Sequence, residues 1–205
     1  SIYIILFVQF ELSFDKFHSR ADQIYRIGVR GMMMNNEINQ AITAAPMADA
    51  LRNEFPEVVT ACRIQDAGDW LIKYEEKKIN EQNMLFADST FFQVFSFRLL
   101  KGDPNKVLQE PKSIVITETA AKKYFGNDDP IGKLVKVETD TTLYKVTGLM
   151  EDVPENSHFK FELLGSLVTL RGSRNTFWIS HNFYTYVVLK NGTDPIEFEN
   201  KIQSM

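Results

Sequence analysis

The residues of this sequence best suited to catalytic or metal chemistry are three histidines and one cysteine. His18, His158 and His181 are far apart, and none belongs to a metal-binding spacing such as H-E-x-x-H. Cys62 is the only cysteine, so the chain can form neither an intramolecular disulfide nor a multi-cysteine metal site. Residues 58–64 around it have the composition of a strand, which favours a small buried apolar residue over a reactive thiol.

The sequence also lacks the short motifs that organise other kinds of catalytic site. There is no G-x-S-x-G elbow for a nucleophilic serine, no P-loop and no G-x-G-x-x-G. ATP is therefore not bound here through a Walker motif. We predict that the chain is not an enzyme, with no catalytic residue and no cofactor.

Two groups of acidic residues have oxygens that calcium could use, namely Asp128 with Asp129, and Glu151 with Asp152 and Glu155. Neither follows the EF-hand pattern, and acids in turns are usually solvated. The methionines at 32–34 have no neighbouring cysteine or histidine pair to complete a soft-metal site. We therefore predict no metal site.

The segment 152–158 indicates structural chemistry instead. Asn156 and Ser157 follow Pro154, and such side chains fix turns by bonding to nearby backbone groups. We predict that His158 makes a hydrogen bond that closes this loop, with a ligand-binding role as the alternative.

Composition limits the class of protein. The 205 residues are 44% hydrophobic and 24% charged, and 16 Phe with 7 Tyr can fill a core, so the chain should fold. The net charge of -4 and the absence of a Lys/Arg block argue against a nucleic-acid partner. The scarcity of cysteine fits an extracytoplasmic setting.

The first residues are unusually apolar. Residues 2–8 would span only about 10 Å as a helix, whereas a bilayer core needs about 30 Å. They also lack the basic start and cleavage site of a signal peptide. From the residues alone, they are either a buried element of the fold or the last turns of a transmembrane helix. Phe10, Phe14 and Phe17 lie on one helical face and predict a helix over residues 9–20.

The elements that must position these residues follow from periodicity and end signals. Thr117 and Gly126 suit the two ends of a helix over 118–125, and Pro46 suits the first turn of a helix over 46–55. Shorter helices are predicted at 89–95 and from 195 to 202. Strands are predicted at 23–30, 58–64, 70–74, 77–81, 99–104, 113–116, 134–138, 144–150, 159–166 and 183–189.

Several of these segments, taken in order, resemble the periplasmic core domain of MacB/FtsX-like ABC-transporter permeases. The similar segments are residues 8–18 with 21–27, 86–92 with 100–104, 113–126 with 132–133, and 146–159. They extend over nearly the whole chain. Phe14 stands where a tyrosine is common, which keeps an aromatic ring at that position.

The resemblance implies an α+β fold with a porter-like βαβ subdomain and an inserted, mostly β subdomain. The expected porter-like part is residues 20–84 plus 161–205, and the insertion is residues 85–160. Residues 1–19 would be the end of the first transmembrane helix and its periplasmic extension. The motif positions expected to act structurally or in coupling are Glu11, Leu12, Asp15, Phe17, His18, Asp152, Pro154, Asn156, Ser157 and His158.

The resemblance also implies a function. The chain would face the periplasm from the bacterial inner membrane and couple cytoplasmic ATP hydrolysis to export or to mechanical work in the envelope. A helix from Ile2 to His18 would be its lever. The implied partners are an ABC ATPase reached through the membrane part, a second permease copy, and a periplasmic adaptor with an outer-membrane channel. The alternatives are a module that senses peptides or antibiotics and a regulator of a cell-wall hydrolase.

Overall fold

The computed structural model describes residues 13–33, 36–137 and 142–203. Its helices are η1 (Ala21–Gln23), α2 (Met47–Glu54), α3 (Phe91–Val94), α4 (Glu118–Phe125), η2 (Leu167–Thr169), η3 (Arg171–Arg174) and α5 (Pro195–Ile202). Its strands are β1 (Ile24–Ile27), β2 (Val29–Met33), β3 (Asn36–Gln40), β4 (Thr43–Ala44), β5 (Val58–Asp66), β6 (Trp70–Tyr74), β7 (Lys77–Glu81), β8 (Leu85–Ala87), β9 (Leu99–Lys101), β10 (Ser113–Thr117), β11 (Leu134–Val137), β12 (Leu143–Met150), β13 (Leu163–Ser166) and β14 (His181–Leu189).

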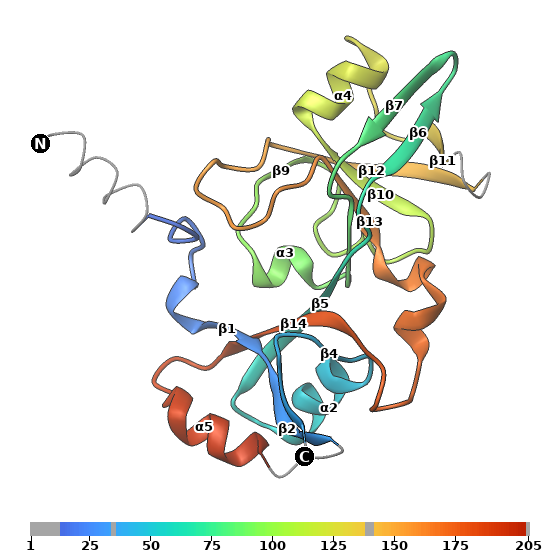
Figure 1. Ribbon diagram of the computed structural model, residues 1–205. Coiled ribbons are helices and arrows are strands. Elements are labelled where there is room, and N and C mark those ends of the chain that lie inside the picture. Colours follow the sequence, from blue (N-terminus) through green and yellow to red (C-terminus); the bar gives the residue numbers. More distant parts are fainter. Residues whose placement is uncertain (1–12, 34–35, 138–141, 204–205) are drawn as a thin grey trace, which may run out of the picture.

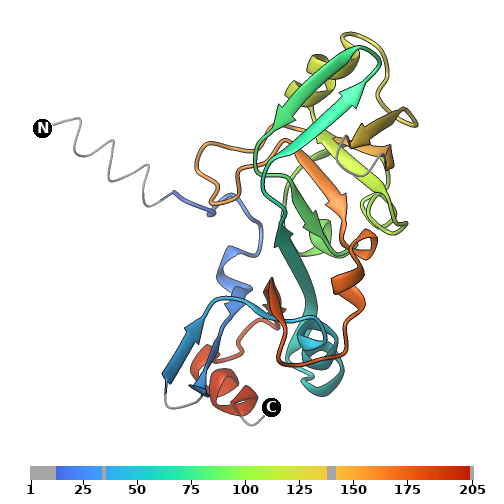
Figure 2. The ribbon, with the colours of Figure 1, turned by 45° about the vertical axis from the view of Figure 1, so that its right-hand side comes forward.

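One mixed sheet of twelve strands runs through the described part of the chain. Its strands follow the order β1-β14-β5-β8-β13-β10-β12-β11-β6-β7, with β4 beside β14 and β9 beside β12. Strands β2 and β3 pair separately. Figures 1 and 2 show a lower lobe with α2 and α5 and an upper lobe with α4, and β5 runs from the lower lobe toward the upper one. The prediction of an α+β fold is confirmed.

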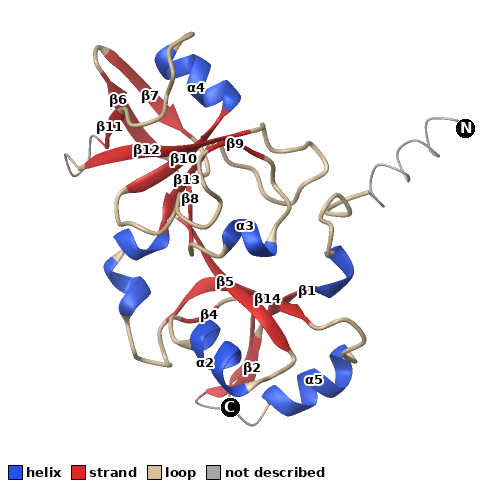
Figure 3. Ribbon diagram, turned by 180° about the vertical axis from the view of Figure 1, so that it is seen from behind, coloured by secondary structure: helices blue, strands red, loops and turns tan. Residues whose placement is uncertain are grey.

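The lower lobe contains the predicted βαβ arrangement in a split form. Strand β14 is antiparallel to both β1 and β5, so β1 and β5 run parallel, with α2 between them in sequence and β14 between them in the sheet. Neighbouring residues of β5 and β14 face opposite sides, and both sides are covered. Ala61 and Val187 pack in the core under α2 and α5, whereas Cys62 and Val188 pack in the core around α3. Figure 3 shows α2 and α5 on one side of β5 and β14 and α3 on the other.

Several local predictions are confirmed because the residues predicted to end a helix or form a turn do so in the structure. The Thr117 side chain accepts a hydrogen bond from the Ala120 N–H at 3.2 Å, and Gly126 ends α4 with a φ of 64°. Strands β6 and β7 form the predicted hairpin, and β6 pairs with β11. This hairpin thus adjoins the strands predicted for the insertion, although residues 70–81 fall in the range predicted as porter-like. The subdomain boundaries stay a prediction.

The predicted helix over residues 9–20 is wrong for Ser13–Arg20. These residues form successive turns followed by η1, and Asp15 has a φ of 58°, in the left-handed region that a right-handed helix excludes. The prediction of a lever helix from Ile2 to His18 is therefore wrong over Ser13–His18. Residues 1–12, including Glu11 and Leu12, lie outside the described residues. No helix within the described ranges is both long and apolar enough to cross a membrane.

The strand predicted over residues 159–166 is right only from Leu163 onwards. Residues 159–162 are loop, although Phe159 and Phe161 alternate with polar residues as in a strand. Both phenylalanines are buried in the core around α3. Apolar and polar residues therefore alternate here because one side of the segment is buried, although the segment does not pair with a neighbouring strand.

Candidate functional site

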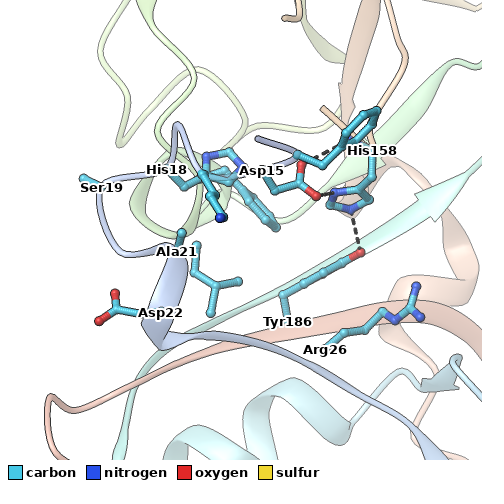
Figure 4. A pocket seen from close by; sticks show the side chains of 12 residues that line it. Asp15, His18, Ser19, Ala21, Asp22, Arg26, His158 and Tyr186 are labelled. Carbon is cyan, nitrogen blue, oxygen red and sulfur yellow. Dashed lines mark hydrogen bonds and ion pairs between the residues drawn. The ribbon is translucent and has the colours of Figure 1, made fainter. Parts of the chain in front are cut away.

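Two segments that contain predicted motif residues lie against each other, although they are far apart in sequence (Figure 4). The Asp15 N–H donates to the Asn156 carbonyl oxygen at 2.9 Å. The Asn156 side-chain amide donates in return to the Ser13 carbonyl oxygen at 3.1 Å and contacts the Ser13 hydroxyl at 3.2 Å. We name residues 13–18, residues 156–158 and Tyr186 the N-terminal clasp.

A chain of hydrogen bonds runs through the middle of the N-terminal clasp. One carboxylate oxygen of Asp15 accepts the His158 backbone N–H at 3.1 Å, and the other is 2.7 Å from His158 Nδ1. His158 Nε2 is 3.0 Å from the Tyr186 hydroxyl. A carboxylate only accepts hydrogen bonds, so Nδ1 of His158 is the donor to Asp15, and Nε2 is left to the tyrosine hydroxyl.

The order of acid, imidazole and hydroxyl is also that of a catalytic triad, but the electrostatics differ. A nucleophile needs a lowered pKa or a base that removes its proton readily. Burial instead raises the pKa of Tyr186 to about 12, so its hydroxyl keeps its proton. The hydrogen bonds of the arrangement hold residues 13–18, residues 156–158 and β14 together.

His18 forms the apolar side of the N-terminal clasp. Its side chain is almost fully buried, its ring lies 4.1 Å from that of Phe17 and 5.3 Å from that of Phe95, and its Nδ1 accepts the Ser96 N–H at 3.1 Å. Burial lowers the pKa of His18 to about 4, against an opposing effect of Asp15. The ring is therefore neutral at pH 7. Its Nε2 has no hydrogen-bond partner within the described part of the chain.

The structure places Asp152 apart from the other motif residues, at the start of α4. Its carboxylate accepts the Thr119 N–H at 3.0 Å and the Thr119 hydroxyl at 2.7 Å. Burial alone would raise the pKa of Asp152, but these hydrogen bonds outweigh it and leave the pKa below its usual value. A carboxylate is favourable at this end of a helix.

Pro154 and Ser157 shape the loop that connects Asp152 to the N-terminal clasp. The Ser157 N–H donates to the Pro154 carbonyl oxygen at 3.1 Å, and the buried Ser157 hydroxyl accepts the Phe159 N–H at 3.1 Å. The loop is thus fixed at both ends, by Thr119 and by Asp15.

Three residues of this arrangement, namely Tyr186, Ser96 and Thr119, were not predicted from the sequence. Tyr186 lies in a strand that was predicted, and its alternation indicates which side of the sheet it faces. Its contact with His158, and the contacts of Ser96 and Thr119 with their partners, depend on tertiary structure and leave no local signal.

A hollow of about 890 Å³ opens beside the N-terminal clasp (Figure 4). Phe14, Phe95 and Tyr186 line its apolar part, and Lys16 and Arg26 bring positive charge to it. Its acidic lining residues, Asp15 and Asp22, balance that charge. Among the residues that the structure describes, no group of three or more His, Cys, Asp or Glu side chains is placed to hold a metal ion.

A second polar cluster, which we name the Arg63 joint, lies between the lobes. The Arg63 guanidinium binds both carboxylate oxygens of Asp88, at 2.9 and 2.8 Å. Its remaining Nη1 donates to the carbonyl oxygens of Ala45 and Ser173, each at 2.8 Å. The joint therefore connects β5, the start of α3, the approach to α2 and η3.

The fold and the site define a class of protein: an α+β domain whose buried and half-buried polar groups hold distant segments together. The family can be named from the whole chain. Residues 1–205 match the family model of the MacB-like periplasmic core domain, so the chain belongs to this family. It is a periplasmic domain of a MacB-like ABC transporter permease. The search of curated proteins found no match.

Three solved structures share the fold. A domain of a putative permease from Porphyromonas gingivalis superimposes with a TM-score of 0.81 at 22% identity, covering 91% of this chain and 81% of that one. The periplasmic region of MacB from Actinobacillus actinomycetemcomitans gives 0.64 at 16%, covering 89% and 81%. The extracellular domain of the ABC-type transporter YknZ from Gram-positive bacteria gives 0.58 at 17%, covering 88% and 86%.

Proposed function

We propose that this domain transmits movement between the membrane part of its permease and the periplasm. ATP hydrolysis by a cytoplasmic partner would drive export, or mechanical work in the envelope, through this domain. The permease would reside in the bacterial inner membrane and act as a dimer with its ATPase. A periplasmic adaptor and an outer-membrane channel are the further partners that we propose.

The N-terminal clasp is the observation that supports this proposal. It attaches the first described residues of the chain to the loop 152–158 by main-chain and side-chain hydrogen bonds. The same loop is attached through Asp152 to Thr119 at the start of α4. A displacement of Ser13–His18 would thus pass along one loop to a helix of the upper lobe. The described part of the lever is a hydrogen-bonded turn and not a continuous helix.

Hydrogen–deuterium exchange on the full-length permease with its ATPase tests this route. We expect vanadate trapping of the nucleotide to change exchange in peptides covering residues 13–18 and 152–162. Asp15→Ala removes the carboxylate that holds His158 and should abolish the change in the second peptide while sparing the first. Asp22→Ala is the matched control, because Asp22 is an exposed acid just beyond the clasp.

Two results would contradict the proposal. One is a wild-type complex in which trapping leaves residues 13–18 and 152–162 unchanged. The other is an Asp15→Ala variant with the full response in residues 152–162. The ATPase rate, measured in parallel, verifies that the nucleotide-binding partner is intact in every sample.

The hollow beside the clasp favours a second candidate function, namely sensing of a peptide or antibiotic. Its volume is in the range of sites for drug-sized ligands, and aromatic side chains line it. Phe14→Ala should then weaken binding of a fluorescently labelled amphipathic peptide about tenfold, as expected for removing a buried aromatic contact. Equal binding by the variant and the wild type would exclude this hollow as the site.

A further inference from the structure

The loop between η3 and β14 exposes three consecutive large apolar side chains. Phe177, Trp178 and Ile179 have exposed fractions of 68%, 46% and 83%. The other large apolar residues that are exposed in the described part of the chain occur singly in the sequence: Val59, Leu100, Ile131, Leu134, Leu143 and Ile196. Single exposed apolar residues are ordinary, whereas a contiguous group marks an interaction site.

The fold holds this loop in a defined shape. The Phe177 N–H donates to the Asn175 side-chain oxygen at 2.9 Å, and His181 Nε2 donates to the Trp178 carbonyl oxygen at 3.0 Å. At the base of the loop, the Ser173 carbonyl oxygen accepts from Arg63 at 2.8 Å. Figures 1 and 3 both show this segment as an open loop at the edge of the molecule. The apolar side chains are therefore presented on a fixed turn.

The charged residues of the loop and of its neighbours in the sequence have one sign. Arg171 and Arg174 precede the apolar group and are exposed, and no Asp or Glu occurs from residue 163 to residue 193. This contrasts with a chain whose net charge is -4. A tip of Phe, Trp and Ile beside arginines is the composition of segments that lie in the interface of anionic bilayers.

We propose that the loop of residues 171–181 binds the surface of an anionic lipid bilayer. Phe177, Trp178 and Ile179 enter the boundary between head groups and acyl chains, and the two arginines contact lipid phosphates. The hydrogen bonds to the Phe177 N–H and the Trp178 carbonyl oxygen satisfy main-chain groups that would otherwise lose water on insertion. This contact is independent of the clasp and of any transmembrane segment.

Tryptophan fluorescence can test the contact at the loop itself. The chain has two tryptophans, and Trp70 is packed against Phe86 with its indole N–H bound to the Ala67 carbonyl oxygen. We expect Trp178 to shift to the blue and to be quenched by brominated lipid in vesicles of phosphatidylcholine with phosphatidylglycerol. Trp178→Phe isolates the Trp70 signal, which should not respond. This measurement also separates the loop from the apolar residues 2–8, which contain no tryptophan.

Matched variants determine what drives the contact. The Phe177→Ser/Ile179→Ser variant should need at least about tenfold more lipid for the same quenching. The Arg171→Gln variant should need about fivefold more lipid for the same quenching. Lys190 is an exposed charged residue outside the loop, so the Lys190→Gln variant should need no more lipid than the wild type. Ile196→Ser is the apolar control, because Ile196 on α5 is 69% exposed, close to the 68% of Phe177.

Three results would overturn the proposal. The chain could sediment with vesicles while Trp178 remains unquenched, which would assign binding to another segment. The Phe177→Ser/Ile179→Ser variant could match the wild type while circular dichroism shows both to be folded. Trp178 could instead shift with protein concentration in the absence of lipid, which would assign the loop to contacts between copies of the chain.

Discussion

The N-terminal clasp and the Arg63 joint both connect segments that are remote in sequence, but they differ in burial and chemistry. The side chains of Arg63 and Asp88 are only 11% and 17% exposed, and a permanently charged guanidinium is at the centre. The side chains of His158 and Asp15 are 38% and 33% exposed, and the central group is an imidazole. The ion pair of the Arg63 joint is mostly buried and contains a permanently charged guanidinium, whereas the His158–Asp15 pair of the N-terminal clasp is partly exposed to solvent.

This difference indicates which junction can open. Removing one partner of a buried ion pair leaves a charge without solvent or counterion, so the Arg63 joint should break only when the fold does. Water can replace the partners in a half-exposed pair at little cost. Movement between parts of this domain should therefore occur at the N-terminal clasp, with the Arg63 joint as the fixed point.

The largest effect should come from Arg63→Ala. It leaves Asp88 without its partner and removes the donor to the Ala45 and Ser173 carbonyl oxygens. The free energy of unfolding should fall by about 3–5 kcal/mol, measured by urea denaturation. A loss no larger than that from His158→Gln in the partly exposed pair would show that the two junctions are equivalent.

Lowering the pH should weaken the N-terminal clasp next most strongly. The pKa of His18 is about 4 in the folded chain, below its ordinary value of 6.5, so the unfolded chain binds more protons between these values. The free energy of unfolding should therefore fall by up to about 3 kcal/mol as pH drops from 6.5 to 4. Urea denaturation across this range measures it. His18→Gln should flatten the profile, and an unchanged slope in that variant would contradict the assignment to His18.

A double-mutant cycle on Asp15 and His158 should give a smaller value. Because both side chains are about one-third exposed, we expect a coupling free energy of about 1 kcal/mol between Asp15→Asn and His158→Gln. Equilibrium unfolding of the four proteins provides it. A coupling free energy larger than that of a buried ion pair would contradict the comparison, because the N-terminal clasp would then be the more rigid junction.

Tyr186→Phe should have the smallest effect. It removes one neutral hydrogen bond to His158 Nε2 and keeps the ring in the core, so the loss should be about 0.5 kcal/mol in the same denaturation experiment. A loss several times larger would mean that the hydroxyl, and not Asp15, fixes the imidazole.

Much of the fold could be predicted because its local signals agree with its tertiary contacts. Helix α4 begins at Thr117 and ends at Gly126, and the β6–β7 hairpin has its turn at the predicted place. Residues 13–18 are the instructive failure. The spacing of Phe14 and Phe17 suits a helix, but Asp15 adopts a left-handed conformation and bonds to main-chain and side-chain groups of residues 156–158. The hydrogen bonds to those partners stabilise this conformation more than the local helix preference of residues 13–18 would stabilise a helix.

The site was predictable only in part, for a similar reason. The composition of residues 152–158 indicated a fixed turn with a hydrogen-bonded histidine. The partner of His158 is Asp15, 143 residues away, and no local pattern records such a distance. Asp152 was grouped with the same motif, yet its side chain lies on Thr119, because neighbours in a loop can face different elements.

The burial of Cys62 has a practical consequence for studying this domain. It is the only cysteine of the chain, it is fully buried in β5, and burial raises the pKa of its thiol well above the usual value. Thiol reagents act on the thiolate, so Cys62 should remain unlabelled in the native domain at neutral pH. Single cysteines introduced at exposed positions can then carry spin labels or fluorophores without prior replacement of the native residue. The natural sequence is thus already a background for distance measurements across its two junctions.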